Sequence, residues 1–476
     1  MTRRRVRADL AVIGAGSGGL SVAAGAAQLG LKVVLFEKGE MGGDCLNWGC
    51  VPSKALIAAA DAAASARSAE RLGVRAQPEI DFPAVMAHVR RAIETIAPHD
   101  SQGRFEGLGV TVVREAARFT GPRAVESDSV AVTARKVVIA TGSHPRLPAV
   151  PGLESVAYLT NETIFSLHEL PARLLVLGAG PIGLELGQAF RRLGSEVVVI
   201  EHGSPLPRED RDLVEPLLEQ LRLDGVERLS GARVLEVEHA PAGVGLTVEV
   251  GGERRRLEGA HLLVAVGRKP ALDGLDLEAA GVAYDAHGVH TDSMLRSVSN
   301  RAVFAVGDAA GRQLFTHVAG AHAGLVVRKA LFAQRVDVER LVVPRVTYTD
   351  PEVAVVGLTE TQARAAHGDA VRVLTVPFSG NDRAVAEGDV RGFGKLVLDP
   401  RGKVLGAALV GRSAGELIHP WALALDAKLP LRAFTSFIAP YPTRGEIHKR
   451  LAGAFYTPIL FSGRTRALVS LLKRFG

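Results

Sequence analysis

The chain has 476 residues, of which 47% are hydrophobic and 23% charged, and its formal net charge is +6. This length predicts roughly three domains with sizeable cores. The charge is a mild bias for so long a chain, and the sequence lacks a basic stripe with interleaved aromatics, which excludes nucleic-acid binding. Abundant glycine and only 5% aromatic residues favour an α/β architecture with tight strand-to-helix turns.

The N-terminal region resembles a membrane span or a signal sequence only superficially. Residues 10–31 carry no charge and follow an arginine-rich start. Glycines interrupt this run in the order that a phosphate-binding turn needs, so we expect a nucleotide-binding strand and helix. A chain with only two cysteines has no disulfide framework, and we expect a cytoplasmic protein.

One pattern occurs twice, in residues 8–38 and 172–202. Each copy has an apolar strand, a GxGxxG motif, a helical stretch and a second strand that ends in Glu37 or Glu201. Such a βαβ unit binds a dinucleotide, with the pyrophosphate at the helix N-terminus and the acid on a ribose. Two complete copies therefore predict two dinucleotide sites. The glycines are Gly14, Gly16 and Gly19 in the first copy and Gly178, Gly180 and Gly183 in the second.

Three further apolar runs are predicted to be strands that lead into a turn: residues 137–145, 262–270 and 304–311. Asp308 lies in the turn of the third run. From about residue 341 short strands alternate with turns and are followed by helical stretches. This pattern predicts an α+β module without a nucleotide motif.

Both cysteines, Cys45 and Cys50, lie in the segment GGDCLNWGCVPSK (42–54). No histidine or cysteine cluster completes a zinc site, and a disulfide closing so short a loop would stabilise little. The remaining interpretation is a redox-active pair. Residues five apart lie about 140° apart on a regular helix, so joining them needs a distorted helix start, which Gly49 permits. A helix N-terminus and nearby Lys54 would favour the thiolate.

Together these motifs resemble the flavin-dependent pyridine nucleotide–disulfide oxidoreductases, and within them the group of dihydrolipoamide dehydrogenase, glutathione reductase and mercuric reductase. The resemblance rests on the two GxGxxG units, GGDCLNWGCVPSKAL (42–56), ATG (140–142), VGRKP (266–270), FAVGD (304–308), YTDPEVAVVGLTE (348–360) and AGELI (414–418). It implies two Rossmann-like domains, for FAD and NAD(P), and a C-terminal α+β dimerisation domain. The implied divisions are an FAD-binding domain at 1–150 and 271–340, an NAD(P)-binding domain at 151–270 and an interface domain at 341–476 that ends in a basic extension.

The resemblance also implies the cofactors and their ligands. FAD would bind at Gly14, Gly16, Gly19 and Glu37, with Asp308 on its ribityl chain. The second unit would bind the nicotinamide dinucleotide, and the acid Glu201 favours NADH, although nearby Arg208 leaves NADPH open. The remaining cofactor-binding residues would be Lys38, Gly43, Lys54, Thr141, Gly142 and Gly267.

In the catalytic roles implied by the resemblance, Cys50 lies against the flavin and Cys45 attacks the disulfide substrate. Lys54 and Glu185 form a pair beside the reactive flavin nitrogen; outside this context they would be a surface lysine and a helix-capping acid. No metal ligands are expected. Electrons would pass from NADH through FAD and the cysteines to a small-molecule or lipoyl-type disulfide.

The sequence departs from the family at one catalytic position. Family members carry a His-Pro…Glu motif that reaches the partner subunit's cysteines and supplies an acid/base. The matching stretch here is APYPTRGEIHK (439–449), in which Glu446 is present but Tyr441 stands in place of the histidine. Tyrosine is a poor base at neutral pH. His448 and His419 are the alternatives nearby.

This departure leaves three hypotheses open. The first is a homodimeric disulfide reductase of the dihydrolipoamide dehydrogenase type. The second is a mercuric reductase-like or quinone- or metal-reducing flavoenzyme, although the chain lacks the further cysteine pair that handles mercury. The third is an electron-carrying flavin subunit of a larger complex.

The last 26 residues, 451–476, extend past the usual end of the family. They mix cations such as Arg464 and Lys473 with apolar residues such as Leu468 and Phe475. A basic amphipathic helix here could dock on a membrane or a partner. The favoured interpretation is a helix packed on the interface domain.

Overall fold

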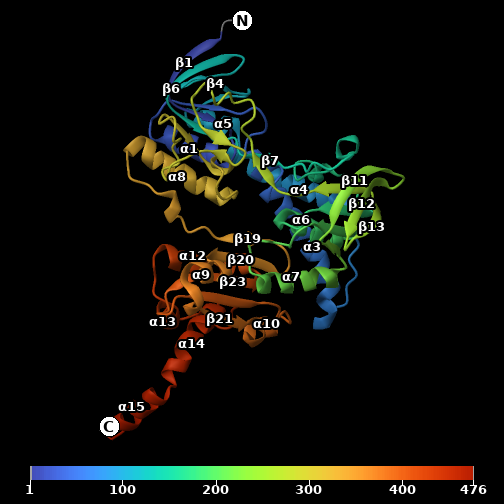
Figure 1. Ribbon diagram of the computed structural model, residues 1–476, viewed down its shortest axis with the longest axis vertical. Coiled ribbons are helices and arrows are strands. Elements are labelled where there is room, and N and C mark those ends of the chain that lie inside the picture. Colours follow the sequence, from blue (N-terminus) through green and yellow to red (C-terminus); the bar gives the residue numbers. More distant parts are fainter. Residues whose placement is uncertain (1–2, 475–476) are drawn as a thin grey trace.

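The computed structural model describes residues 3–474. The two strands of the first βαβ unit are part of its first sheet (Figure 1). Parallel strands β2 and β6 flank β1, and the sheet order is β3-β2-β1-β6-β5-β4, with β18 also paired to β6. Helices α1 and α8 pack on this sheet and against each other. The bounds are β1 Arg4–Ile13, α1 Ser17–Gln28, β2 Val33–Phe36, α5 Gln102–Gly107, β3 Thr111–Val113, β4 Arg118–Gly121, β5 Ala124–Glu126, β6 Val130–Ile139, β18 Val303–Ala305 and α8 Thr316–Phe332.

The glycine-interrupted run at 10–31 thus forms a strand and a helix, as predicted from its glycines. Within residues 3–474, none of the helices has the length and apolarity needed to cross a membrane.

The second βαβ unit builds a parallel sheet of order β10-β9-β8-β14, with an antiparallel sheet β11-β12-β13 beside it. A short pair, β7 with β15, lies where the chain passes between the two nucleotide units. The bounds are β7 Ser143–Pro145, β8 Arg173–Leu177, α6 Pro181–Leu193, β9 Glu196–Glu201, α7 Arg211–Asp224, β10 Glu227–Ser230, β11 Arg233–Ala240, β12 Gly243–Val250, β13 Glu253–Gly259, β14 His261–Val264, β15 Arg268–Pro270, β16 Tyr284–Asp285 and β17 Gly288–Val289.

The C-terminal part is an antiparallel sheet of order β19-β20-β23-β22-β21 with helices around a core that includes Trp421 and Ile447. The α/β class with two Rossmann-like units and an α+β C-terminal part is confirmed. The bounds are β19 Arg345–Thr347, β20 Glu352–Gly357, α9 Glu360–His367, β21 Arg372–Pro377, α10 Asp382–Ala386, β22 Phe393–Leu398, β23 Val404–Gly411, α11 Ala414–Leu417, α12 His419–Asp426, α13 Ala433–Ser436 and α14 Glu446–Leu460.

One apolar core joins all three parts. Helix α3 (Cys50–Ser68) begins at a cysteine, follows the short α2 (Gly43–Asn47) and packs against α4 (Phe82–Ile96) and α6. Leu56 of α3 shares this core with Leu184 of α6 and Val353 of β20. The packing fixes the start of α3 relative to the second nucleotide unit, and the positions of the site residues depend on it.

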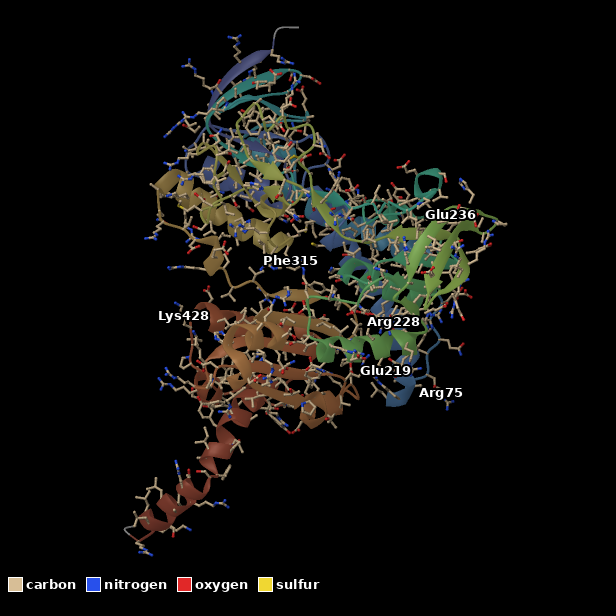
Figure 2. The ribbon with its side chains drawn as sticks, viewed as in Figure 1. Arg75, Glu219, Arg228, Glu236, Phe315 and Lys428 are labelled. Carbon is tan, nitrogen blue, oxygen red and sulfur yellow. The ribbon has the colours of Figure 1, made fainter. Side chains whose placement is uncertain are left out.

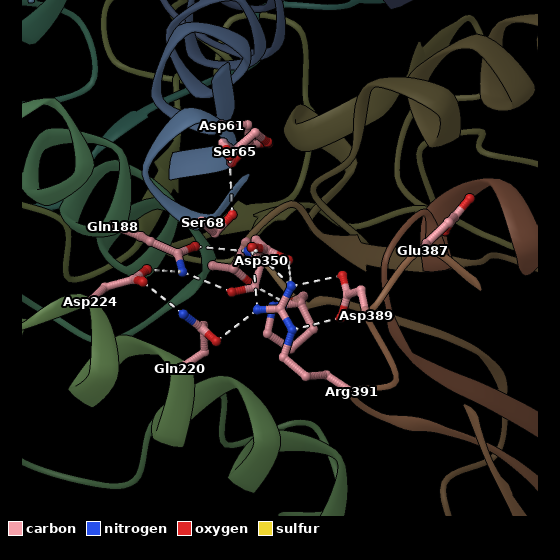
Figure 3. A network of polar contacts seen from close by, with 12 residues as sticks. Asp61, Ser65, Ser68, Gln188, Gln220, Asp224, Asp350, Glu387, Asp389 and Arg391 are labelled. Atoms are coloured by element: carbon pink, nitrogen blue, oxygen red, sulfur yellow. Dashed lines mark hydrogen bonds and ion pairs between the residues drawn. The ribbon is translucent and has the colours of Figure 1, made fainter. Parts of the chain in front are cut away.

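A charged network lies at the same junction (Figure 3). The Arg192 side chain is only 5% exposed and pairs with Asp61 at 2.7 Å, Asp224 at 2.8 Å and Asp350 at 2.8 Å. Arg391 also binds Asp350, at 3.1 Å. Because these residues come from α3, α6, α7 and the C-terminal part, the network links all three parts.

The predicted packing of the C-terminal extension, residues 451–476, on the interface domain holds for its start, where Leu451, Ala452 and Phe455 of α14 are buried in the C-terminal core, but not for its last helix. Helix α15 (Gly463–Leu472) follows α14, projects away from the molecule (Figure 1) and buries none of its residues. The apolar residues of this helix lack a partner within residues 3–474. Phe475 lies outside the described residues.

Candidate active site

The first glycine loop leaves no room for a side chain at Gly14 or Gly19. Gly14 has φ +102°, and a Cβ there would lie 2.4 Å from the Ala140 carbonyl oxygen. A Cβ at Gly19 would lie 1.8 Å from the Gly14 carbonyl oxygen. The turn is therefore tight and α1 lies close to its strand, as a phosphate-binding loop requires.

The second glycine loop repeats this geometry. Gly178 has φ +109°, and a Cβ at Gly183 would lie 2.0 Å from the Gly178 carbonyl oxygen. A Cβ at Gly180 would meet no described atom within 4 Å, so the backbone at this helix start is open to a ligand.

The two strand-end acids have matching partners. Glu37 accepts backbone N–H bonds from Ala15 at 2.6 Å and Gly39 at 2.7 Å. Glu201 accepts them from Ala179 at 2.6 Å and Gly203 at 2.8 Å. Each carboxylate thus lies against its glycine loop, where a dinucleotide ribose would lie. Lys38 is exposed beside Glu37.

The first loop fits FAD on several observations. No side chain of the described residues caps α1 at Gly16, so its N-terminal N–H groups remain available to a pyrophosphate. A Cβ at Gly43 would lie 2.7 Å from the Gly16 Cα, so this side of the loop also needs glycine. Thr141 Oγ1 is buried and lacks a protein hydrogen-bond partner within residues 3–474, as expected for a cofactor ligand. Next to Thr141, Gly142 has φ +71°.

Asp308 belongs to a polar network that sequence reasoning missed. It accepts a hydrogen bond from Ser143, and burial raises the pKa of its carboxyl although this hydrogen bond opposes the shift. Arg268 donates to Ser143 Oγ at 2.8 Å and lies 3.1 Å from Asp44 beside Cys45. Arg268 follows Gly267 in the VGRKP motif, so the sequence identified this segment but not the residues that Arg268 contacts. The network connects the FAD-side turn with the cysteine segment.

The cysteines are free thiols at the distorted helix start that was predicted. Cys45 lies in α2, Cys50 begins α3, and the intervening Gly49 has backbone angles outside the helical region. Cys50 is hydrogen-bonded to Thr316 Oγ1 at 3.2 Å, and the two thiols lie close enough for each to shift the pKa of the other.

The surroundings of the two cysteines shift the pKa values of their thiols in opposite directions. The neighbouring Cys45 thiol, then Thr316 and the charge of Lys54, lower the pKa of Cys50 against the effect of burial. The neighbouring Cys50 and burial raise the pKa of Cys45. One proton is therefore retained on Cys45 while Cys50 ionises.

Lys54 and Glu185 meet as an ion pair, with Lys54 Nζ 2.8 Å from Glu185 Oε2. Burial opposes the charge of Lys54, but the Glu185 carboxylate outweighs it and the pKa of Lys54 is raised. Glu185 accepts the Tyr348 N–H at 2.9 Å, and Lys54 lies 4.3 Å from the centre of the Tyr348 ring. Glu185 is thus neither free nor a helix cap, and Tyr348 is a further residue that the sequence did not single out.

The structure places the candidate acid/base residues near the C-terminus in different surroundings. Tyr441 is 71% exposed and donates to Asp382 at 2.9 Å, and this hydrogen bond raises its pKa. His448 is buried beside Trp421, and burial lowers its pKa to about 4. His419 is exposed and contacts the Glu416 carbonyl. Glu446 Oε2 is buried without a hydrogen-bond partner in the described part of the chain.

Comparison with known proteins assigns most of the chain to the same family as the sequence motifs. Residues 8–323 match the pyridine nucleotide-disulphide oxidoreductase family, and residues 343–452 match its dimerisation domain, which supports a homodimer. Dihydrolipoyl dehydrogenase of Thermus scotoductus is 38% identical, covering 92% of this chain and 95% of that protein. Mercuric reductase of Lysinibacillus sphaericus is 34% identical, covering 94% of this chain and 82% of that protein.

A solved structure agrees. The Cu(II) complex of the HOCl-induced flavoprotein disulfide reductase RclA from Escherichia coli has a TM-score of 0.84 at 27% identity, covering 95% of this chain and 99% of that one. Proteins of this family are enzymes that bind FAD and NAD(P)H. The chain belongs to the pyridine nucleotide-disulphide oxidoreductase family.

Proposed function

We propose that the protein is an NADH-dependent enzyme that passes two electrons through Cys45 and Cys50 to a small disulfide or another thiol-reactive acceptor. The observation that supports this most is the setting of Cys50, whose thiol lies between Cys45, Thr316 and the cation Lys54 and has a lowered pKa. Low-pKa, accessible thiols are the reactive ones.

When bound, FAD would accept hydride from the nicotinamide and deliver the electron pair to the cysteine disulfide. The residues of this chain would then act on protons and charges. Lys54, held by Glu185, stabilises the Cys50 thiolate, while Cys45 holds the remaining proton. For a disulfide acceptor the balance is NADH, one proton and the disulfide giving NAD⁺ and two thiols.

We infer NADH rather than NADPH as donor. The Glu201 carboxylate at the end of β9 favours a free ribose diol and repels a 2′-phosphate. Arg208 is exposed and lines a cleft with Arg345 and Thr359 of the C-terminal part.

A dithiol of this kind suits a reducing compartment, and we propose the cytoplasm.

A metal ion is the second candidate acceptor, and Tyr441 favours it. Cys45 must lose its proton to attack a disulfide, which needs a base, and a tyrosine with a raised pKa does not supply one. A thiophilic metal ion displaces the thiol proton by binding sulfur. Relatives include a mercuric reductase and a disulfide reductase solved with Cu(II).

Anaerobic titration of the purified FAD-loaded protein with NADH tests the thiol route. We expect a long-wavelength absorbance band after two electrons, from the Cys50 thiolate beside the flavin, and its loss in Cys50→Ser. Direct bleaching without this band would contradict the proposal and direct attention to quinones. Turnover with lipoamide, glutathione disulfide and Cu(II) then separates the two acceptor classes. The docking role that the sequence left open for the C-terminal extension is independent of this chemistry.

A further inference from the structure

The C-terminal arm, residues 459–474, forms a surface that the rest of the described chain leaves uncovered. Phe455 is the last buried side chain of α14 and contacts Arg372, whose guanidinium lies 4.3 Å from the centre of its ring. Beyond it the chain leaves the C-terminal domain, and the side chains of the arm stand clear of the molecule (Figure 2).

The arm combines exposed apolar side chains with charged side chains that are all positive. Its large apolar side chains are each roughly half exposed or more: Ile459 53%, Leu460 59%, Phe461 66%, Leu468 55%, Val469 46%, Leu471 50% and Leu472 58%. Its charged residues are Arg464, Arg466, Lys473 and Arg474, and the sequence has no acid after Glu446. An occupant of this surface must therefore be both apolar and anionic.

Most residues of α15 fall on two sides of the helix. Leu468, Leu471 and Leu472 have the i, i+3, i+4 spacing that places them on one face, with Arg464 at its N-terminal end, four residues before Leu468. Arg466, Ser470 and Lys473, the residue that caps the helix, have the i, i+4, i+7 spacing of another face. A helix with an apolar face and a basic face lies in the plane of a membrane interface, with its cations among the lipid headgroups.

A second copy of the chain fits the arm less well. The match to the dimerisation domain ends at residue 452, before the arm begins. Two-fold pairing of arms would also bring two segments together whose charges are all positive, because a two-fold contact pairs a surface with itself. Like charges would then oppose the association.

We propose that the arm docks the enzyme on membranes that contain anionic phospholipids. One helix of ten residues binds weakly, but a dimer presents two arms, and their joint attachment is stronger than either alone. Binding depends on both parts of the surface, apolar and basic. It also falls as salt rises, because the headgroup attraction is screened.

Sedimentation of the full-length FAD-loaded dimer with lipid vesicles tests this. We expect binding to vesicles of phosphatidylcholine mixed with phosphatidylglycerol and little binding to phosphatidylcholine alone. Leu468→Glu/Leu472→Glu should abolish binding, and Arg466→Gln/Lys473→Gln should weaken it by at least about 25-fold, from about fivefold for each cation. Leu223→Glu, at a 62% exposed leucine of α7, is the matched control and should bind like the wild type.

NADH oxidation should be unchanged in all these variants, which shows that they fold. The proposal is overturned if the wild-type dimer ignores anionic vesicles or if the leucine double variant still binds them. It is also overturned if light scattering finds an oligomer larger than the dimer that the leucine variant disperses, since the arm would then bind other copies.

Discussion

Lys54 and Glu185 are 131 positions apart in the chain, yet their side chains form a 2.8 Å ion pair. Lys54 lies one helical turn after Cys50 on α3, and Glu185 lies on α6 of the second nucleotide unit. The packing of these two helices therefore holds a positive charge near the Cys50 thiol.

Replacing Lys54 by Met should raise the pKa of Cys50. In the wild type the thiolate persists below the ordinary thiol pKa of about 8.5, and loss of a nearby cation should shift its titration upward by about 1–2 units. The measurement is the long-wavelength absorbance of the two-electron-reduced enzyme against pH. Lys403→Met, at an exposed position between two strands, should leave the midpoint unchanged, and an equal midpoint in both variants would contradict this role for Lys54.

Replacing Tyr441 by His should increase disulfide reduction. A histidine near its ordinary pKa can take the proton that Cys45 holds, and such general base catalysis is typically worth about 10²–10⁴ in rate. Steady-state turnover with lipoamide or glutathione disulfide measures the gain. Tyr441→Phe should leave the disulfide rate near that of the wild type. A large loss in the Phe variant would show that the tyrosine hydroxyl already acts in catalysis.

Replacing Arg192 by Leu should destabilise the junction of the three parts. It leaves Asp61, Asp224 and Asp350 without their shared cation, and breaking a buried ion pair costs about 3–5 kcal/mol. Thermal unfolding should shift downward by at least about 5 °C. The control Arg211→Leu removes a 91% exposed partner of Glu215 and should change little. Equal unfolding temperatures in the two variants would exclude a structural role for the network.

Glu352 should make stability fall as pH rises towards neutrality. Burial, with help from Asp61, Glu416 and Asp350, raises the pKa of its carboxyl to about 7 against the opposing Gly415 N–H bond. The folded state then binds a proton more tightly than the unfolded state, whose pKa is about 4.3. Stability from this group is complete below about 4.3 and is lost as pH rises through the folded pKa.

Glu352→Gln should therefore stabilise the protein above neutrality, by about 1–3 kcal/mol, and change little at mildly acidic pH. Thermal unfolding at both pH values measures the difference. Glu416→Gln, at the exposed neighbouring acid, is the comparison. If the Glu352→Gln variant has the same pH dependence as the wild type, another group must titrate.

The local parts of the site followed from the sequence because they depend on short-range geometry. The glycine spacing predicted both phosphate-binding turns, since only glycine fits where a Cβ at Gly14 or Gly178 would strike a backbone oxygen. The distorted start of α3 followed from Gly49 between the cysteines. The α/β class followed from the repeated βαβ pattern.

Contacts between distant segments were decided by the tertiary structure alone. The side chains that hold Lys54, Asp308 and Arg192 come from positions far along the chain, and no local pattern records which helix faces pack together. Tyr348 and Arg268 were missed for this reason. The apolar residues of α15 suggested that this helix is buried, but the described fold buries none of them. Apolar content indicates that a helix has a face able to pack against another surface, and it does not indicate which surface that is.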